Sequence, residues 1–336
     1  MKIQRILNYF IAGFFAFIFL NILCIIYYLN PVHITTETGV TDYFWEKSAY
    51  YSKMTEGYGY GRMNNEGFNN LNDYNNQRIE ILLMGTSHME GTNVPQNKTT
   101  AAVLNKLFTN SKYVYNIGIS GHEFPHIINN VETAIQFYSP KEYVIIEIMD
   151  VRFDLLSLEQ CINSDLQRLP SYDSKFVFYL QKIPYLRLIY SQFKFHEDLV
   201  KRDENSKENT TIANADRYSH ALESAIKKLS RISNEHGLNI IVFYHPQLHL
   251  NFDGTIQGIT DIEYLLLLKK YCAANNVFFI NMFETFKKEY ETIHKLPHGF
   301  SNTALGIGHL NVYGHEIIAK KLFEVINNIE EKGTGI

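Results

Sequence analysis

A serine and a histidine stand side by side where an apolar run ends, in the stretch ILLMGTSHMEG at residues 81–91. A serine becomes a nucleophile when a tight turn exposes it beside a base, and Gly85 permits such a turn. An ordinary strand-to-helix turn and a phosphate-binding loop are the alternatives. The second alternative needs several glycines and a lysine before the serine, and these are lacking here. The pattern therefore favours Ser87 as a nucleophile, with backbone N–H groups of the following helix start available to an oxyanion.

A nucleophilic serine needs a base, and His309 is the strongest candidate. It lies two residues before Asn311, a good N-cap for the last helix, on a short connection flanked by glycines. A histidine taken at random more often packs in a core or faces solvent, and His309 stands out by its position. The other histidines weighed for this role are His88, His122, His126, His245, His249, His298 and His315.

Strand-length apolar runs recur along the chain, at 79–84, 113–117, 143–148, 239–244 and 277–282. Such nearly continuous runs are typical of strands buried on both faces. Amphipathic helical patterns lie between them, as at 122–138 and 216–236. The alternation predicts an α/β fold in which helices cover both faces of a parallel sheet. Ligands bind beyond the carboxyl ends of such strands, and Ser87 lies at one of those ends.

The N-terminus is nearly all apolar from Ile6 to Leu29, and only Asn8 and Asn21 interrupt it. A helix needs roughly 20 such residues to cross a bilayer. Lys2 and Arg5 precede the run, so the positive-inside rule places the N-terminus in the cytoplasm and the rest outside. A cleaved signal peptide is the alternative, but the run is long for one and no small-residue cleavage site follows. We expect a retained single-pass anchor in the cell membrane.

Three regions are expected: an anchor at 1–30, a juxtamembrane segment at 31–77 and an α/β domain at 78–330. The aromatic residues of the juxtamembrane segment either pack it onto the domain, which we favour, or stack on sugars or the membrane surface. Residues 151–213 exceed a simple crossover, so they are expected to form an insertion beside the site, as a lid or a partner surface.

The composition narrows the function. The 336 residues are 46% hydrophobic and 20% charged, with a net charge of −4, so no broad basic surface favours nucleic acid. The three cysteines are too few for a zinc site or a disulfide framework, so no metal or cofactor is expected. Cys161 and Cys272 could pair outside the cytoplasm, although two free buried thiols are favoured.

Three short motifs resemble the SGNH/GDSL hydrolase superfamily over roughly residues 65–326. GTSHMEG resembles block I, with Thr86 where aspartate is usual, and NIGISG resembles block II, whose oxyanion glycine matches Gly121. GHLNVYGHEIIA resembles the C-terminal block and aligns His309 with the catalytic base. NNEGFNN is similar to a segment that precedes block I in membrane-anchored members that modify polysaccharides.

The chain departs from this pattern at two positions. Val151 lies near the place of the block III asparagine, and Gly306 stands where the family has its aspartate. The expected site is therefore a Ser–His dyad oriented by a backbone carbonyl, or a triad with a carboxylate from elsewhere, with Asp150 and Asp154 as candidates. Glu147 lies inside a predicted strand and would need a buried partner.

The resemblance implies a flavodoxin-like three-layer α/β/α sandwich and a serine esterase or O-acyltransferase that acts on acyl esters of cell-surface carbohydrate, with acetyl esters expected. In this mechanism Ser87 attacks the acyl carbonyl, His309 takes its proton, and the N–H groups of Ser87 and Gly121 bind the oxyanion. The resemblance also implies a membrane-bound O-acyltransferase as a candidate partner. A non-catalytic carbohydrate-binding or assembly protein on the same fold is the alternative.

Overall fold

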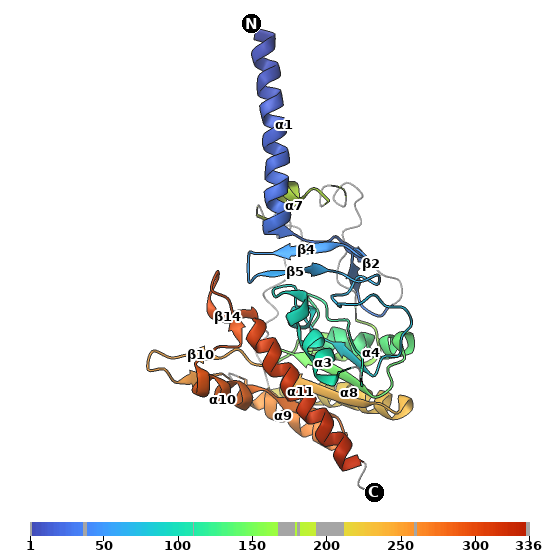
Figure 1. Cartoon of the computed structure of the whole chain (residues 1–336). Helices are drawn as coiled ribbons and strands as arrows, with labels where there is room; N and C mark the ends of the chain where they lie inside the picture. The colour runs from blue at the N-terminus through green and yellow to red at the C-terminus, as the bar shows by residue number, and fades with distance from the viewer. Residues whose placement is uncertain are drawn as a thin grey trace.

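The computed structural model describes residues 2–35, 39–109, 111–166, 179, 182–192, 212–258 and 261–333. A long N-terminal helix, α1 (Lys2–Tyr27), projects from one end of the body, and the C-terminus lies at the opposite end (Figure 1). By length and composition α1 can cross a membrane, although a signal sequence would meet the same criteria. Most of its large apolar side chains are exposed.

Five parallel strands form the central sheet in the order β12-β9-β8-β6-β7. The strands are β6 (Ile81–Met84), β7 (Val114–Asn116), β8 (Tyr143–Ile148), β9 (Asn239–Tyr244) and β12 (Phe278–Asn281). Numbered along the chain this order is 2-1-3-4-5, the flavodoxin-like arrangement. All five predicted strands are present, and the α/β fold prediction is confirmed.

Helices cover both faces of this sheet, and the strand side chains alternate between two cores. In β6, Leu82 and Met84 join one core, while Ile81 and Leu83 join the other. The first core is covered by α4 (Phe124–Tyr138), α5 (Leu155–Ile162), α8 (Ile212–His236) and α9 (Ile262–Ala274). The second is covered by α3 (Thr100–Phe108), α10 (Phe283–Ile293) and α11 (Val312–Gly333). The result is a three-layer sandwich.

The residues before the first sheet strand form small antiparallel sheets that pack on the body. One sheet joins β1 (Tyr28–Leu29), β4 (Tyr50–Lys53) and β5 (Gly59–Arg62), and the other joins β2 (His33–Thr35) and β3 (Tyr43–Trp45). The first lies between α1 and the sandwich (Figure 1). Gly59 fits because a Cβ there would lie 1.8 Å from the carbonyl oxygen of Thr92. The strand thus packs directly against the segment that follows Ser87.

Short elements complete the described chain. They are α2 (Ser87–Glu90), a 3-10 turn at Gln96–Lys98, α7 (Pro184–Gln192), β10 (His249–Leu250), β11 (Ile256–Gln257), β13 (His298–Gly299) and β14 (Leu305–Leu310). Much of the predicted insertion at 151–213 lies outside the described residues. One of its described helices, α7, lies beside the lower end of α1 (Figure 1). Cys24, Cys161 and Cys272 are free and buried.

Candidate active site

Ser87 begins the short helix α2, directly after β6. Thr86 caps this helix, because its side chain accepts a hydrogen bond from the N–H of His88 at 3.2 Å. Gly85 is required here by close approach, since a Cβ would lie 2.6 Å from Oε2 of Glu147. The sharp turn at the end of a buried strand leaves Ser87 partly exposed. Its hydroxyl is therefore available at the switch point of the sheet, between β6 and β8.

Ser87, His309 and Glu56 form a continuous hydrogen-bonded chain. The Ser87 Oγ lies 2.9 Å from Nε2 of His309, and the Nδ1 of His309 lies 2.8 Å from Oε2 of Glu56. The backbone N–H of His309 also donates to Oε1 of Glu56, at 2.8 Å. Both oxygens of one carboxylate thus fix the position and the tautomer of the imidazole. This is the geometry of a serine, histidine and acid triad.

The group that orients His309 is the carboxylate of Glu56, which was not among the candidates named from the sequence. Asp154 instead caps α5, where it accepts hydrogen bonds from the N–H and the hydroxyl of Ser157. Asp150 lines the cavity beside Ser87, and burial together with the charge of Asp261 raises the pKa of its carboxyl. The orienting group is a side chain from the juxtamembrane segment, rather than either aspartate or a backbone carbonyl.

Glu56 lies in the turn between β4 and β5, far from Ser87 and His309 in the sequence. Gly308 admits it, because a Cβ at Gly308 would lie 2.5 Å from Oε1 of Glu56. Partial burial raises the pKa of Glu56, but the hydrogen bonds and charge of His309, with the charge of Lys53, outweigh that effect and hold its pKa at about 2. The carboxylate is ionised at neutral pH, as a partner of an imidazolium must be.

The buried Glu147 hydrogen-bonds to the turn that carries Ser87. Its Oε2 accepts a hydrogen bond from the N–H of Thr86 at 2.6 Å, and its Oε1 contacts Nε2 of His245. Both Glu147 and His245 are fully buried. The expected buried partner of Glu147 is therefore His245, together with the turn that carries Ser87.

A second buried glutamate, Glu90, orders the loop that contains Gly121. It accepts hydrogen bonds from the N–H and the hydroxyl of Ser120 and from the indole of Trp45. Gly121 has a φ of 83°, which favours glycine, and it lines the same cavity as Ser87. Its role as an oxyanion donor stays a prediction. Val151 is buried in the core.

His88, His245 and His298 are buried together, with ligand atoms within 4.8 Å of one another. The N–H of Leu310 donates to Nδ1 of His88 at 3.2 Å, so the proton of the neutral ring is on Nε2. Because His245 Nδ1 lies 3.2 Å from His298 Nε2, we interpret the group as a hydrogen-bonded chain that extends from Glu147.

The remaining rival histidines have other surroundings. Nε2 of His122 lies 3.4 Å from Asp42, and His126 takes part in the capping box of α4. His249 is exposed on β10, whereas His315 is buried and bonded to Thr100. Among the candidates, His309 is the one bonded to the Ser87 hydroxyl.

His315 provides a test of pH-dependent stability. Burial, with the charges of His245 and His309, lowers its pKa from 6.5 to about 3. Below pH 6.5 the unfolded chain binds a proton at His315 that the folded chain does not, so the free energy of unfolding falls as the pH falls toward about 3. In the wild type this proton accounts for roughly 2 kcal/mol of the fall in the free energy of unfolding between about pH 7 and about pH 5. His315→Asn keeps an acceptor for Thr100, and we expect it to abolish that part of the fall. Urea unfolding in detergent at both pH values measures this, and identical pH dependence in the two proteins would contradict it.

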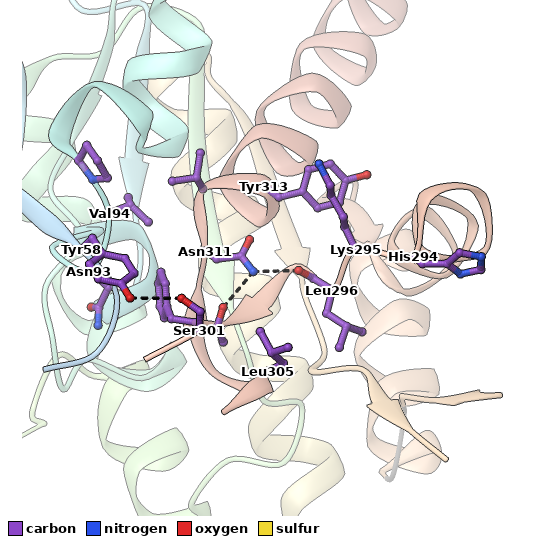
Figure 2. Close-up of a pocket in the computed structure, with 14 residues that line it drawn as sticks. Tyr58, Asn93, Val94, His294, Lys295, Leu296, Ser301, Leu305, Asn311 and Tyr313 are labelled. Carbon is purple, nitrogen blue, oxygen red and sulfur yellow. Dashed lines mark hydrogen bonds between the residues drawn. The ribbon is translucent and has the colours of Figure 1, made fainter. Parts of the chain in front are cut away.

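Two cavities lie near the triad residues. The first, of about 240 Å³, lies over Ser87 and is lined by Gly121, Phe124, Asp150 and Arg152 among others. The second, of about 450 Å³, lies between Tyr58, Leu296, Ser301 and Tyr313 (Figure 2). Within the described chain the lining of the second cavity includes no member of the triad, but Tyr58 and Asn311 stand two residues from Glu56 and His309.

Comparison with solved structures finds distant likenesses to hydrolases. An acetyl xylan esterase, AlAXEase, is 13% identical with a TM-score of 0.42, over 74% of this chain and 100% of its own. The esterase EstA from Pseudoalteromonas sp. is 10% identical with a TM-score of 0.39, over 75% and 98%. A member of the lipolytic G-D-S-L family from Veillonella parvula is 15% identical with a TM-score of 0.40, over 74% and 98%.

These solved structures are distant, at 10–15% identity and TM-scores below 0.5. They include proteins described as G-D-S-L family members and as esterases. No family model and no curated protein matches the sequence. The functional argument for this chain therefore depends on its own residues.

Proposed function

We propose that the chain is a membrane-anchored serine esterase or O-acyltransferase of the SGNH/GDSL type, which acts outside the cytoplasm on acyl esters of cell-surface carbohydrate. The observation that carries this proposal is the triad. Ser87 Oγ lies 2.9 Å from His309, and His309 lies 2.8 Å from Glu56. A chance contact would not align a partly exposed hydroxyl, both imidazole nitrogens and an ionised carboxylate in series.

The chemistry follows from these positions. Ser87 Oγ attacks the acyl carbonyl while Nε2 of His309 takes its proton, and Glu56 stabilises the imidazolium. The N–H groups of Ser87 and Gly121 are the proposed donors to the oxyanion. His309 then returns the proton to the leaving alcohol. Water or a sugar hydroxyl, activated by the same imidazole, releases the acyl group from Ser87.

The second cavity supports a carbohydrate acceptor or donor. Tyr58 and Ser301 hydrogen-bond across its mouth at 3.2 Å, and Lys295 lies 5.7 Å from the ring centre of Tyr313 (Figure 2). Aromatic rings beside hydroxyl and amide groups suit the apolar faces and polar edges of sugars. A sugar bound there would lie beside the triad, with its hydroxyl in competition with water for the acyl-enzyme.

A fluorophosphonate probe tests the proposal, because it reacts only with an activated serine. The full-length protein in detergent is expected to be labelled at Ser87, and Ser87→Ala is expected to remain unlabelled. Ser111→Ala is the control and should be labelled like the wild type, since Ser111 follows α3 and its hydroxyl bonds the carbonyl of Phe108. Absence of labelling in the folded wild type would favour the non-catalytic carbohydrate-binding alternative.

A further inference from the structure

One described helix of the insertion, α7, packs against the anchor. The rings of Phe17 and Tyr185 lie 6.0 Å apart in an edge-to-face contact. The N–H of Tyr185 donates to Oδ1 of Asn21 at 3.2 Å. Asn21 itself donates to the carbonyl of Phe17 at 2.9 Å. One of the two polar residues in the apolar run is therefore occupied in docking a second helix.

The position of these contacts along α1 sets their depth. Asn21 lies about 9 Å, and Phe17 about 15 Å, before the end of the helix at Tyr27. Half of the hydrocarbon core of a bilayer is about 15 Å thick. If α1 spans the membrane with Tyr27 at the outer interface, the start of α7 therefore lies below the level of the headgroups.

The chemistry of α7 suits that position. Pro184 has no N–H to satisfy, and the N–H of Tyr185 is capped by Asn21. Hydrocarbon offers no water to satisfy a free N–H, so a cap on this helix start matters more there than in water. Leu186 and Ile189 are partly exposed. At the polar side, Lys182 pairs with Glu46 at 2.9 Å, and Arg187 donates to the carbonyl of Pro31 at 2.7 Å.

The anchor is also joined stiffly to the body. The carbonyl of Tyr27 accepts from the N–H of Met54, and the carbonyl of Ile25 accepts from the hydroxyl of Ser52. Because β1 follows α1 without a linker, Tyr28 pairs directly with Lys53, three residues before Glu56. The depth of α1 in the membrane would therefore determine the height of the Ser87 site above the lipid.

We propose that α7 is an interfacial helix that lies in the outer leaflet against α1, docked by Asn21, and that the pair holds the Ser87 site at a fixed short height above the lipid. This inference rests on the proposed function only in requiring that α1 be a membrane anchor. It assigns a lipid-facing role to part of the insertion, in place of a lid. It also implies a substrate that is presented at the membrane surface.

Quenching of tryptophan by brominated phosphatidylcholine in vesicles tests this. Leu186→Trp is expected to be quenched most by bromine near the depth of Asn21, about 9 Å below the outer interface, after subtraction of the signal from the buried Trp45. Phe252→Trp, at an exposed site on the β10–β11 hairpin, is the control that should not be quenched. Circular dichroism of each variant confirms that it is folded.

The outcomes separate this inference from the function proposed above. Leu23→Trp, on α1 itself, must be quenched if the anchor is in the bilayer. If Leu23→Trp is quenched but Leu186→Trp behaves like Phe252→Trp, the placement of α7 is wrong while the anchor stands. If neither is quenched, the membrane anchor itself fails.

Asn21→Leu tests the docking contact, with Asn8→Leu as its matched control in the same apolar run. The interhelical hydrogen bond is expected to shift the docking equilibrium about fivefold. Quenching of Leu186→Trp should therefore change in the Asn21→Leu background and stay constant in the Asn8→Leu background. Equal quenching in both backgrounds would overturn the role assigned to Asn21.

Discussion

Replacement of Ser87 by alanine is expected to remove nearly all turnover of an acetyl ester, by about 10⁴-fold or more if the enzyme is efficient. His309→Ala should be about as damaging, because the serine hydroxyl is a poor nucleophile without a base. The double variant should be scarcely worse than either single one, since members of one catalytic unit do not contribute additively. Initial rates, with folding checked by circular dichroism, provide the measurement.

Two results would contradict this expectation. Full activity of Ser87→Ala would remove the serine mechanism. Strict additivity in the double variant would mean that Ser87 and His309 act separately despite their 2.9 Å contact. His88→Ala is not a clean comparison, because the buried His88 accepts from the N–H of Leu310 and its ring centre lies 5.0 Å from that of His309.

Glu56→Gln is expected to lower kcat by about 10⁴-fold while the fold persists. The amide keeps the shape of the side chain but loses the charge that stabilises the imidazolium, and its NH₂ group can stabilise the wrong tautomer of His309. Because the pKa of Glu56 is held at about 2, the wild-type carboxylate should stay charged across the neutral and mildly acidic range. Activity should therefore show no loss from protonation of Glu56 until the pH approaches that value.

Asp150→Asn and Asp154→Asn are the matched controls for this variant. Each removes one acid near the carboxyl end of β8, and neither acid is the partner of His309 in the structure. Both should retain most of the wild-type kcat. A near-normal rate for Glu56→Gln, with loss in Asp150→Asn, would show that Asp150 and not Glu56 supplies the acid in catalysis.

The sheet was predictable because burial on both faces leaves a strong local pattern. The runs at 143–148 and 239–244 coincide with β8 and β9. Asn311 also behaves as expected, since its side chain accepts from the N–H of Gly314 at the start of α11. These features depend on neighbours in sequence, and so sequence alone could reveal them.

Glu56 was not predictable in the same way. It reaches His309 through packing of a two-stranded turn against the body, a contact between residues 253 positions apart. One weak signal existed: Gly308, directly before the base, has a φ of 96° and leaves room for another group. The favoured interpretation of the juxtamembrane aromatics was packing, and Trp45 and Tyr51 are indeed buried, but packing alone gave no hint of an acid.

Glu56, between β4 and β5, belongs to a different part of the chain from Ser87 and His309, so a single cleavage could separate the acid from the other two residues. Ser87 and His309 belong to the sandwich, whereas Glu56 belongs to the juxtamembrane segment that follows α1. A protease that cut between β5 and β6 would leave the sandwich with its nucleophile and base, joined to the acid only by non-covalent packing. If such a cut released the sandwich, Ser87 and His309 would be separated from Glu56, so the activity proposed above would persist only in the tethered protein.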